Sequence, residues 1–574
     1  MNAVAPICTL PIEVLAYIFD LSVHSASFSD EEDAHLGNDY PFDPANMMTT
    51  LCISSVSRYW RNISMSTPSL WTDMCISTEL PQEDDEESSQ MRNAMKPNAS
   101  RILAYLARSS NSPIDILISA RDTNWDFCET EVSMDAQYLE DAPYTHPFLS
   151  KQMHDAMDLL LPHAARWRSL TILSDTCSPM HAALARLSQF NPYSPFGAPF
   201  LEKIVLKRCN EYIGSYPEFM PREMKDTPDI PFAGLLDKTG GEFLPSLREL
   251  KLHGVHINWN NLPPIIPASS GGLRSLELSE HAYEVRPSLV DFRRILQTSP
   301  NLRKLIVGVS GPTWDQEDAL TEEASNARPI PLPLLAELTL KYTDAEDARH
   351  VLLHVDAPNA MSLRISDVTP VAFPEQEDAS ALLATCGTSS WGNHARFPAL
   401  REITMDRIEA CSSTPFRTCF EGLPKLERLS LEHTSTHAVS ALQPHEYVVP
   451  GPEPEVVEFA PCPNLHSVSI RGAMLDFKLI AHTRDARIEN GAMPFEPELT
   501  LDHWCPGDVV PVGARGSEVP GVQVRIRNGE SYEEGGIDYM DMEDLEMEEM
   551  MICSKELAPF DTIAGVFGEL EWVL

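Results

Sequence analysis

The chain has 574 residues, of which 43% are hydrophobic, and its 85 Asp and Glu against 43 Lys and Arg give a formal net charge of −42. This length suits two or more folded units or one elongated repeat array. The negative charge excludes nucleic acid and membrane surfaces as broad partners, because clustered Lys and Arg bind phosphate groups. The twelve cysteines include no C-x-x-C pair. With no secretory signal and no apolar run of the roughly 18 residues that span a membrane, we expect a cytoplasmic or nuclear protein.

The N-terminal part contains two short apolar segments at helical spacing. In the first, Pro11 suits the first turn of a helix, where its missing N–H has no intrahelical partner. Val14, Leu15, Ile18 and Phe19 then recur with the period of one helical face.

The second apolar segment predicts a helical stripe at steps of three and four through Met48, Cys52, Val56, Tyr59 and Ile63, and it closes in T-P-S-L-W. So small a unit cannot bury this apolar surface against itself, so it needs a partner. An ordinary amphipathic helix pair, packed on the rest of the chain, is the alternative.

Together the two segments resemble the F-box, a three-helix module, in its fungal form. The matching residues are Leu10, Pro11, Glu13, Val14, Leu15, Ile18, Phe19, Val56, Ser57, Arg58, Trp60, Arg61, Ile63, Pro68, Leu70 and Trp71. The resemblance implies that this head binds a Skp-family adaptor, and through it a cullin, in an SCF-type ubiquitin ligase. It assigns adaptor binding to Leu10, Pro11, Val14, Leu15, Ile18, Phe19, Val56 and Trp60. An acidic insert at residues 22–46 departs from the usual short connection, at small entropic cost.

From residue 167 onward, the pattern L-x-x-L-x-L recurs with other aliphatic residues tolerated. The second and third positions are two residues apart, so in a strand they point to the same face. One such unit cannot cover its apolar face, so the units must stack. The copies are Trp167/Leu170/Ile172, Leu201/Ile204/Leu206, Leu247/Leu250/Leu252, Leu273/Leu276/Leu278, Leu302/Leu305/Val307, Leu335/Leu338/Leu340, Ala360/Leu363/Ile365, Leu400/Ile403/Met405, Leu426/Leu429/Leu431 and Leu465/Val468/Ile470.

These copies resemble leucine-rich repeats, in which each unit adds a strand to a parallel sheet and a returning segment to the convex side. Successive copies lie 25 to 46 residues apart, whereas regular repeats keep to about 20–29. We therefore expect insertions at residues 210–242, 370–396 and 434–461. Of the positions where such repeats carry a ladder of Asn or Cys, only Cys209 fits, so we expect no ordered asparagine ladder. An ordinary α/β domain with parallel strands is the alternative.

The predicted fold class is α+β with α/β repeats: a small all-helical F-box head followed by an irregular leucine-rich-repeat-like solenoid. The expected parts are the head at 1–75, an acidic linker with connecting elements at 76–150, the solenoid at 151–480, and a capping segment with an acidic tail at 481–574. Within these parts, residues 114–118 and 522–526 read as strands. Nine carboxylates at 533–549 indicate a solvated tail, with a partner-binding motif or a loose cation site as alternatives.

No catalytic motif is present: the sequence lacks a G-x-S-x-G elbow, a phosphate-binding G-x-x-x-x-G-K-[ST] loop and H-E-x-x-H. His433, His437 and His445 have spacings that a metal could use, but they fall in an expected loop without a cysteine ligand. We therefore expect no metal, no cofactor and no catalytic residue. The expected function is a substrate-recognition subunit whose repeats bind a target protein of unknown identity.

Two other functions remain open from the sequence. One is a non-catalytic interaction scaffold that acts outside a ligase complex. The other is an enzyme whose site lies in the irregular inserts, which would require a convergent polar pocket. Four arginines, Arg274, Arg303, Arg401 and Arg428, lie at or near strand positions. They either receive an anionic group or balance neighbouring Glu residues.

Overall fold

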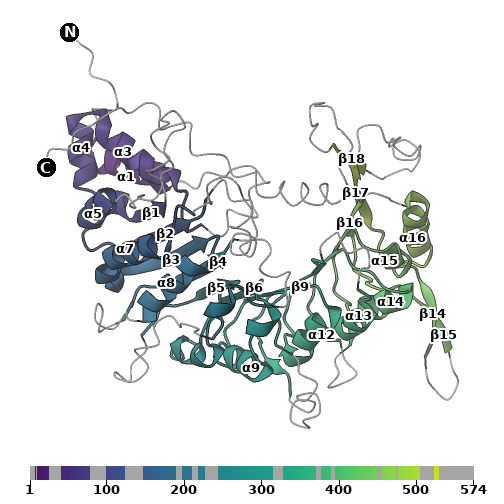
Figure 1. Ribbon diagram of the computed structural model, residues 1–574. Coiled ribbons are helices and arrows are strands. Elements are labelled where there is room, and N and C mark those ends of the chain that lie inside the picture. The colour runs from purple at the N-terminus through teal and green to yellow at the C-terminus, as the bar shows by residue number, and fades with distance from the viewer. Residues whose placement is uncertain are drawn as a thin grey trace, which may run out of the picture.

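The computed structural model describes residues 7, 10–24, 40–77, 99–122, 146–188, 197–209, 218–226, 243–313, 328–369, 377–388, 395–449, 455–472, 476–503 and 523–528. Strands in these ranges form one long parallel sheet, which lines the inner side of an arc (Figure 1). In spatial order its strands are β1 (Asp73–Ser77), β2 (Ile114–Ala120), β3 (Trp167–Ser174), β4 (Lys203–Arg208), β5 (Glu249–His253), β6 (Ser275–Ser279), β7 (Lys304–Gly308), β9 (Glu337–Tyr342), β11 (Ser362–Asp367), β12 (Glu402–Asp406), β13 (Arg428–Glu432), β16 (Ser467–Gly472), β17 (Glu496–His503) and β18 (Gln523–Asn528).

The register of the sheet follows the repeated aliphatic residues. Leu250 of β5 pairs with Leu276 of β6, which in turn pairs with Leu305 of β7, and all three side chains are buried. Because successive side chains of a strand alternate between faces, the residues between the aliphatic ones point to the inner surface of the arc. The second and third positions of every copy fall on strands of this sheet, so the predicted repeat fold is confirmed.

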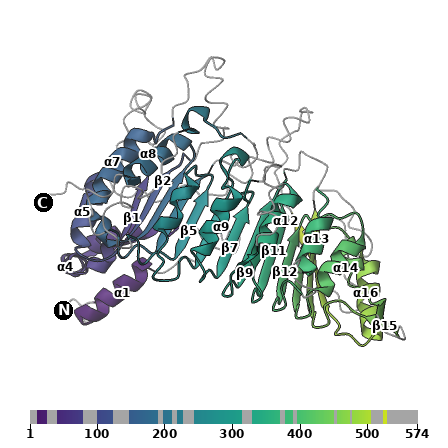
Figure 2. The same cartoon turned by 90° about the horizontal axis from the view of Figure 1, so that it is seen from below.

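Helices and short 3-10 turns return the chain along the outer side of the arc, as Figures 1 and 2 show. Since a packed helix is about 10 Å wide and neighbouring strands are about 4.8 Å apart, an outer layer of helices bends the array toward its strands. The outer elements are α5 (Ala99–Arg108), α7 (Ser150–Leu160), η6 (Leu161–Arg166), α8 (Cys177–Ser188), α9 (Leu289–Gln297), α12 (Ala345–His354), α13 (Ser380–Gly387), α14 (Ser413–Glu421), α15 (His437–Ser440) and α16 (Phe477–Glu489).

The remaining described elements are the helical head and several short pieces. The head, which is residues 10–71, lies at the β1 end of the array. Its elements are α1 (Ile12–His24), α3 (Ala45–Val56), α4 (Arg58–Met65) and η3 (Pro68–Trp71). The short pieces are η7 (Arg222–Met224), η9 (Trp259–Asn261), η10 (Pro263–Ile265), η11 (Tyr283–Val285), the paired β8 (Ile330–Pro331) and β10 (Val355–Asp356), and the hairpin of β14 (His445–Val449) and β15 (Glu455–Phe459).

The solenoid is longer than the sequence predicted. Its sheet begins at β1 instead of residue 151, so β1, α5 and β2 belong to the array, although β1 spans the expected boundary between head and linker and α5 and β2 fall in the expected linker. At the other end β17 and β18 extend it beyond residue 480, and β18 includes residues 523–526 of the strand expected at 522–526. The reason is hydrogen bonding: a parallel strand left at either end exposes unpaired N–H and C=O groups, which a further strand satisfies.

Two of the expected insertions contain regular elements. Residues 370–396 include α13, which packs between α12 and α14, so this stretch carries the outer helix of a repeat. Residues 434–461 hold α15 and the β14–β15 hairpin. The acidic run at 83–89 and the tail at 533–549 lie outside the described residues.

Hydroxyl groups take part of the role expected for an asparagine ladder. Ser310 accepts a hydrogen bond from the buried His281 N–H at 3.0 Å, and Thr434 accepts one from Ile408 N–H at 3.3 Å. Thr434 also donates to the Met405 carbonyl at 3.0 Å. Both residues occupy the ladder position of their repeats, so the ladder persists in an altered form. An expectation based on Asn and Cys alone does not detect a ladder of hydroxyl groups.

Candidate functional site

The helical head is built around one buried face of α1. Pro11 accepts backbone hydrogen bonds from Val14 and Leu15, both at 3.1 Å, which starts the helix. Leu15, Phe19 and Val23 then fall on one side and are buried. The ring of Phe19 packs on Trp60 of α4, with centroids 4.7 Å apart. This face therefore forms the inside of the head.

A break between α3 and α4 divides the second apolar segment. Ser57 adopts an extended conformation, and its hydroxyl accepts a hydrogen bond from Trp60 N–H at 3.1 Å. It therefore ends α3 and caps α4. The predicted single stripe is wrong for this reason: Cys52, Val56 and Tyr59 are exposed, whereas Ile63 is buried. Sequence periodicity does not show a one-residue helix break.

The opposite side of α1 is apolar and exposed. Val14 is 42% exposed, Tyr17 63% and Leu21 52%, and the half-buried Ile18 lies between them. Their spacing of three and four residues aligns them in a stripe along the helix. We call Val14, Tyr17, Ile18 and Leu21 the outer stripe. None of the other residues that the structure describes buries it.

The predicted adaptor-binding residues divide into two groups. Leu15 and Phe19 are buried, so they support the head from inside and cannot contact a partner, which corrects their assignment. The accessible ones are Pro11, Val14 and Val56, which are exposed, and Leu10, Ile18 and Trp60, which are half-buried. Tyr17 and Leu21, which belong to the exposed outer stripe, were not among the predicted residues. Their steps from Val14 were visible in the sequence, but the inner stripe of Leu15, Phe19 and Val23 has the same period.

The head is joined to the first repeats by a continuous core. Trp71 donates its indole N–H to the Ser64 carbonyl at 2.8 Å, and its ring meets Tyr105 of α5 edge to face at 4.9 Å. Tyr105 donates its hydroxyl to the Met47 carbonyl at 2.7 Å. These buried contacts tie α3, η3 and α5 together, so the outer stripe has a fixed orientation relative to β1 and β2.

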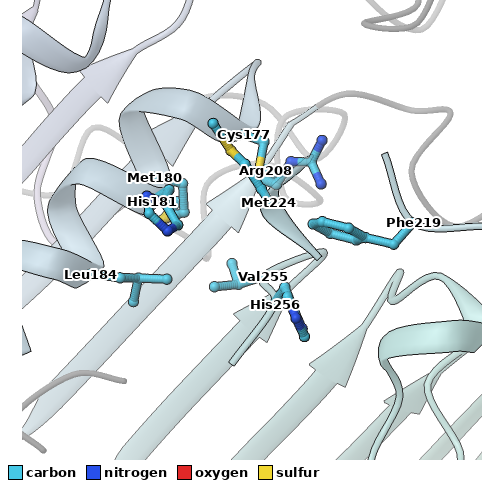
Figure 3. Close-up of a pocket in the computed structure, with 9 residues that line it drawn as sticks. All are labelled: Cys177, Met180, His181, Leu184, Arg208, Phe219, Met224, Val255 and His256. Carbon is cyan, nitrogen blue, oxygen red and sulfur yellow. The ribbon is translucent and has the colours of Figure 1, made fainter. Parts of the chain in front are cut away.

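Figure 3 shows a small pocket between α8 and the ends of β4 and β5. It is lined by Cys177, His181, Arg208, Phe219 and His256, among others. Its volume of about 10 Å³ holds at most one water. Arg208 lies over the Phe219 ring at 5.7 Å. The residues around the pocket therefore pack loop 218–226 against the sheet, and the pocket itself has no room for a substrate.

The described parts of the chain offer no metal cluster and no membrane-spanning helix. There, no group of three or more His, Cys, Asp or Glu side chains is arranged to hold a metal ion. His445 instead contacts Glu421 at 2.8 Å. In the same ranges, every helix is too short or too polar to cross a lipid bilayer.

No protein-family model matches the sequence, and no curated protein matches it. Among solved structures, the chain is similar to one from the Rad7 and Elc1 complex in yeast, with 14% sequence identity and a TM-score of 0.32. The alignment covers 65% of this chain and 77% of that chain. At this level of similarity nothing about function follows.

Proposed function

We propose that the chain is the substrate-recognition subunit of an SCF-type ubiquitin ligase, in the cytoplasm or the nucleus. Its head binds a Skp-family adaptor, and through it a cullin, while the repeat sheet binds a target protein. The proposal joins the F-box-like motifs of the sequence to the outer stripe of α1. It includes no catalytic residue, metal or cofactor in this chain.

The outer stripe is the observation that carries the proposal. Three large apolar side chains on one exposed helix face, Val14, Tyr17 and Leu21, are costly in water, at about 25 cal/mol for each Å² of apolar surface. The inner face of the same helix already completes the core of the head. An apolar face that folding does not need is typical of a surface covered by a partner.

The fixed junction between head and repeats suits this function. A ligase receptor promotes transfer by holding a target lysine near a ubiquitin-charged enzyme, so its gain comes from effective concentration. A rigid connection raises this concentration more than a flexible one, because fewer orientations are sampled. The contacts of Trp71 and Tyr105 supply such a connection.

The test is affinity purification of the full chain and two variants. Val14→Ser/Leu21→Ser makes the outer stripe polar without touching the core. Val290→Ser, on α9, is the matched control, because Val290 is 64% exposed and lies far along the array. We expect a Skp-type protein to be recovered with the wild type and with the control, and lost with the double variant. Equal recovery from all three would refute the proposal.

Recovery of a cullin separates the ligase receptor from the scaffold. If the adaptor is recovered with the wild-type chain and a cullin accompanies it, the ligase assignment is supported. If the adaptor is recovered repeatedly without a cullin, the chain acts as an interaction scaffold outside a ligase.

A further inference from the structure

Three arginines occupy equivalent positions on three neighbouring strands. Arg248, Arg274 and Arg303 each stand directly before the strands β5, β6 and β7. The Arg274 N–H donates to the Arg248 carbonyl at 2.7 Å, and the Arg303 N–H donates to the Arg274 carbonyl at 2.8 Å. Their backbones are therefore stacked at the strand spacing of about 4.8 Å. We call these residues the arginine row.

Three acidic side chains on the strands beside the arginine row already pair with other cations. Glu249 lies 3.2 Å from Lys203, and Glu277 lies 3.6 Å from Lys251. On the next strand, Glu337 lies 3.4 Å from Lys304. These lysines come from the adjacent positions of the sheet, where side chains point into the inner surface. The carboxylates of β5, β6 and β9 are thus engaged away from the row.

The side chains of Arg274 and Arg303 are exposed and make no hydrogen bond or ion pair with any residue in the described ranges. Arg248 is half-buried, and its Nη1 donates to the hydroxyl of Ser270 at 2.7 Å and to the Leu247 carbonyl at 3.1 Å. These are neutral partners, so they orient its guanidinium without neutralising it. The row presents three positive charges on a chain whose net charge is −42.

Other arginines of the same series do have acidic partners. Arg401, at the equivalent position before β12, pairs with Glu427 at 3.0 Å. Arg428, at the start of β13, pairs with Glu402 at 2.7 Å. Of the two roles that the sequence left open for these arginines, Arg401 and Arg428 have the balancing of neighbouring Glu residues. Arg274 and Arg303 do not.

We propose that the arginine row binds an acidic segment of a partner protein. The row extends over two strand spacings, about 10 Å, which several carboxylates fill and a single phosphate group does not. Guanidinium groups bind carboxylates through paired hydrogen bonds in a fixed planar geometry. A long nucleic acid is disfavoured, because most of its phosphates would face the acidic remainder of the chain.

The surface next to the row adds an apolar requirement. Ala336 follows Arg303 in the same backbone ladder, and Met361 follows Ala336, each linked by an N–H to carbonyl bond of 2.8 Å. Met361 is 50% exposed, and Leu334, two residues before Ala336, is 47% exposed. The matching segment therefore carries several carboxylates followed by an apolar residue. This inference deepens the target-binding half of the proposed function, but it holds whether or not the head binds an adaptor.

The experiment measures binding of a fluorescein-labelled peptide of six glutamates followed by two leucines to the full chain, by fluorescence anisotropy. The same peptide with glutamines in place of glutamates reports uncharged contacts. Arg274→Gln/Arg303→Gln removes the exposed charges of the row. Arg401→Gln is the matched control, because it removes one charge from an equivalent position that already has a partner. All these side chains are exposed, so the thermal midpoint is expected to stay unchanged.

We expect the glutamate peptide to bind the wild type and Arg401→Gln alike, more weakly as salt increases, and about tenfold or more weakly to the double variant. No wild-type binding, equal binding by the double variant, or equal binding of the glutamine peptide would overturn the proposal. So would tighter binding of a peptide with one phosphoserine as its only acid, since the ligand would then be a phosphate.

Two further arms keep the outcome specific. Deleting residues 529–574 removes the acidic tail of this chain, and binding that appears only after this deletion would show that the tail is the occupant, which overturns the proposal. Adaptor recovery is measured on the same double variant. If it is retained while peptide binding is lost, the row is a separate site, as we propose. If both are lost, the row is no independent site and the proposal fails.

Discussion

The Nδ1 atom of His24 lies 3.3 Å from Oδ2 of Asp73, so the last turn of α1 contacts the first strand of the sheet. His24 Nε2 is also 3.0 Å from the Ser69 carbonyl. Asp73 is almost fully buried, whereas His24 is partly exposed. The contact with Asp73 raises the pKa of His24 above its ordinary value of 6.5, and burial opposes this shift.

This contact predicts a pH dependence of the head. Because the pKa of His24 is higher in the folded state than in the unfolded state, protonation stabilises folding fully below pH 6.5 and the gain is lost as pH rises through the raised pKa. We expect the thermal midpoint of the head, followed by tryptophan fluorescence, to be lower at about pH 8.5 than at about pH 5.5. His24→Gln should remove this part of the difference. An unchanged pH difference in the variant would show that other groups cause it.

Truncating a side chain on the inner face of α1 should destabilise the head much more than truncating one on the outer face. Phe19→Ala removes a buried ring that packs on Trp60, and we expect it to destabilise the head by about 3–5 kcal/mol. Tyr17→Ala changes an exposed side chain and should stay within about 0.5 kcal/mol. Hydrogen exchange of the α3 and α4 amides measures both. A large loss of protection in Tyr17→Ala would mean that the outer stripe is part of the core.

The hydroxyl ladder predicts a local loss of stability. Ser310→Ala leaves the buried His281 N–H without its acceptor, which costs about 1–3 kcal/mol. His281 cannot compensate by gaining a charge, because burial lowers its pKa to about 3. Exchange of the His281 amide should accelerate accordingly. Thr339→Val, at a half-buried inner position of β9, is the control and should leave that amide unchanged. Equal exchange in both variants would contradict a structural role for Ser310.

Outside the head, we expect the largest loss of stability from a substitution at Arg487. Its fully buried guanidinium donates to the carbonyls of Pro461 at 2.6 Å and Cys462 at 2.8 Å. Burial lowers the pKa of Arg487. Arg487→Met removes these donors and should cost about 2–4 kcal/mol in urea unfolding of the C-terminal repeats. Arg484→Met, which loses a contact with the adjacent Asp485, should cost less than about 1 kcal/mol. Equal losses would exclude the carbonyl contacts as the cause.

The repeats were readable from the sequence because each one repeats the same local demand. Leu250 and Leu252 must face the same way in any strand, and a face that one unit cannot cover forces stacking. The repeat pattern did not identify strands β1 and β17. At β1, Trp71, Met74 and Ile76 have the spacing of the pattern without its leucines, and β17 keeps only Leu499 and Leu501. Both strands join the sheet because its terminal strands leave backbone groups to be paired.

In the helical head, the sequence did not show which residues of α1 face inward. Its apolar residues and their helical period were visible, but Leu15 and Val14 are neighbours of equal polarity, and nothing local says which faces inward. The contact of Phe19 with Trp60, far apart in sequence, decides this. For the same reason Tyr17 and Leu21 were missed among the residues that offer a surface.

Composition, periodicity and order of motifs thus determined the class of the protein: an acidic chain with a small helical head and a stacked parallel sheet. These properties depend on residues close in sequence, whose period is enough to place them on a face. Only the tertiary structure decided which apolar face of α1 stays uncovered and which arginines of the sheet lack a carboxylate. Both depend on neighbours brought together from distant strands and helices, and that proximity is set by packing of the whole chain.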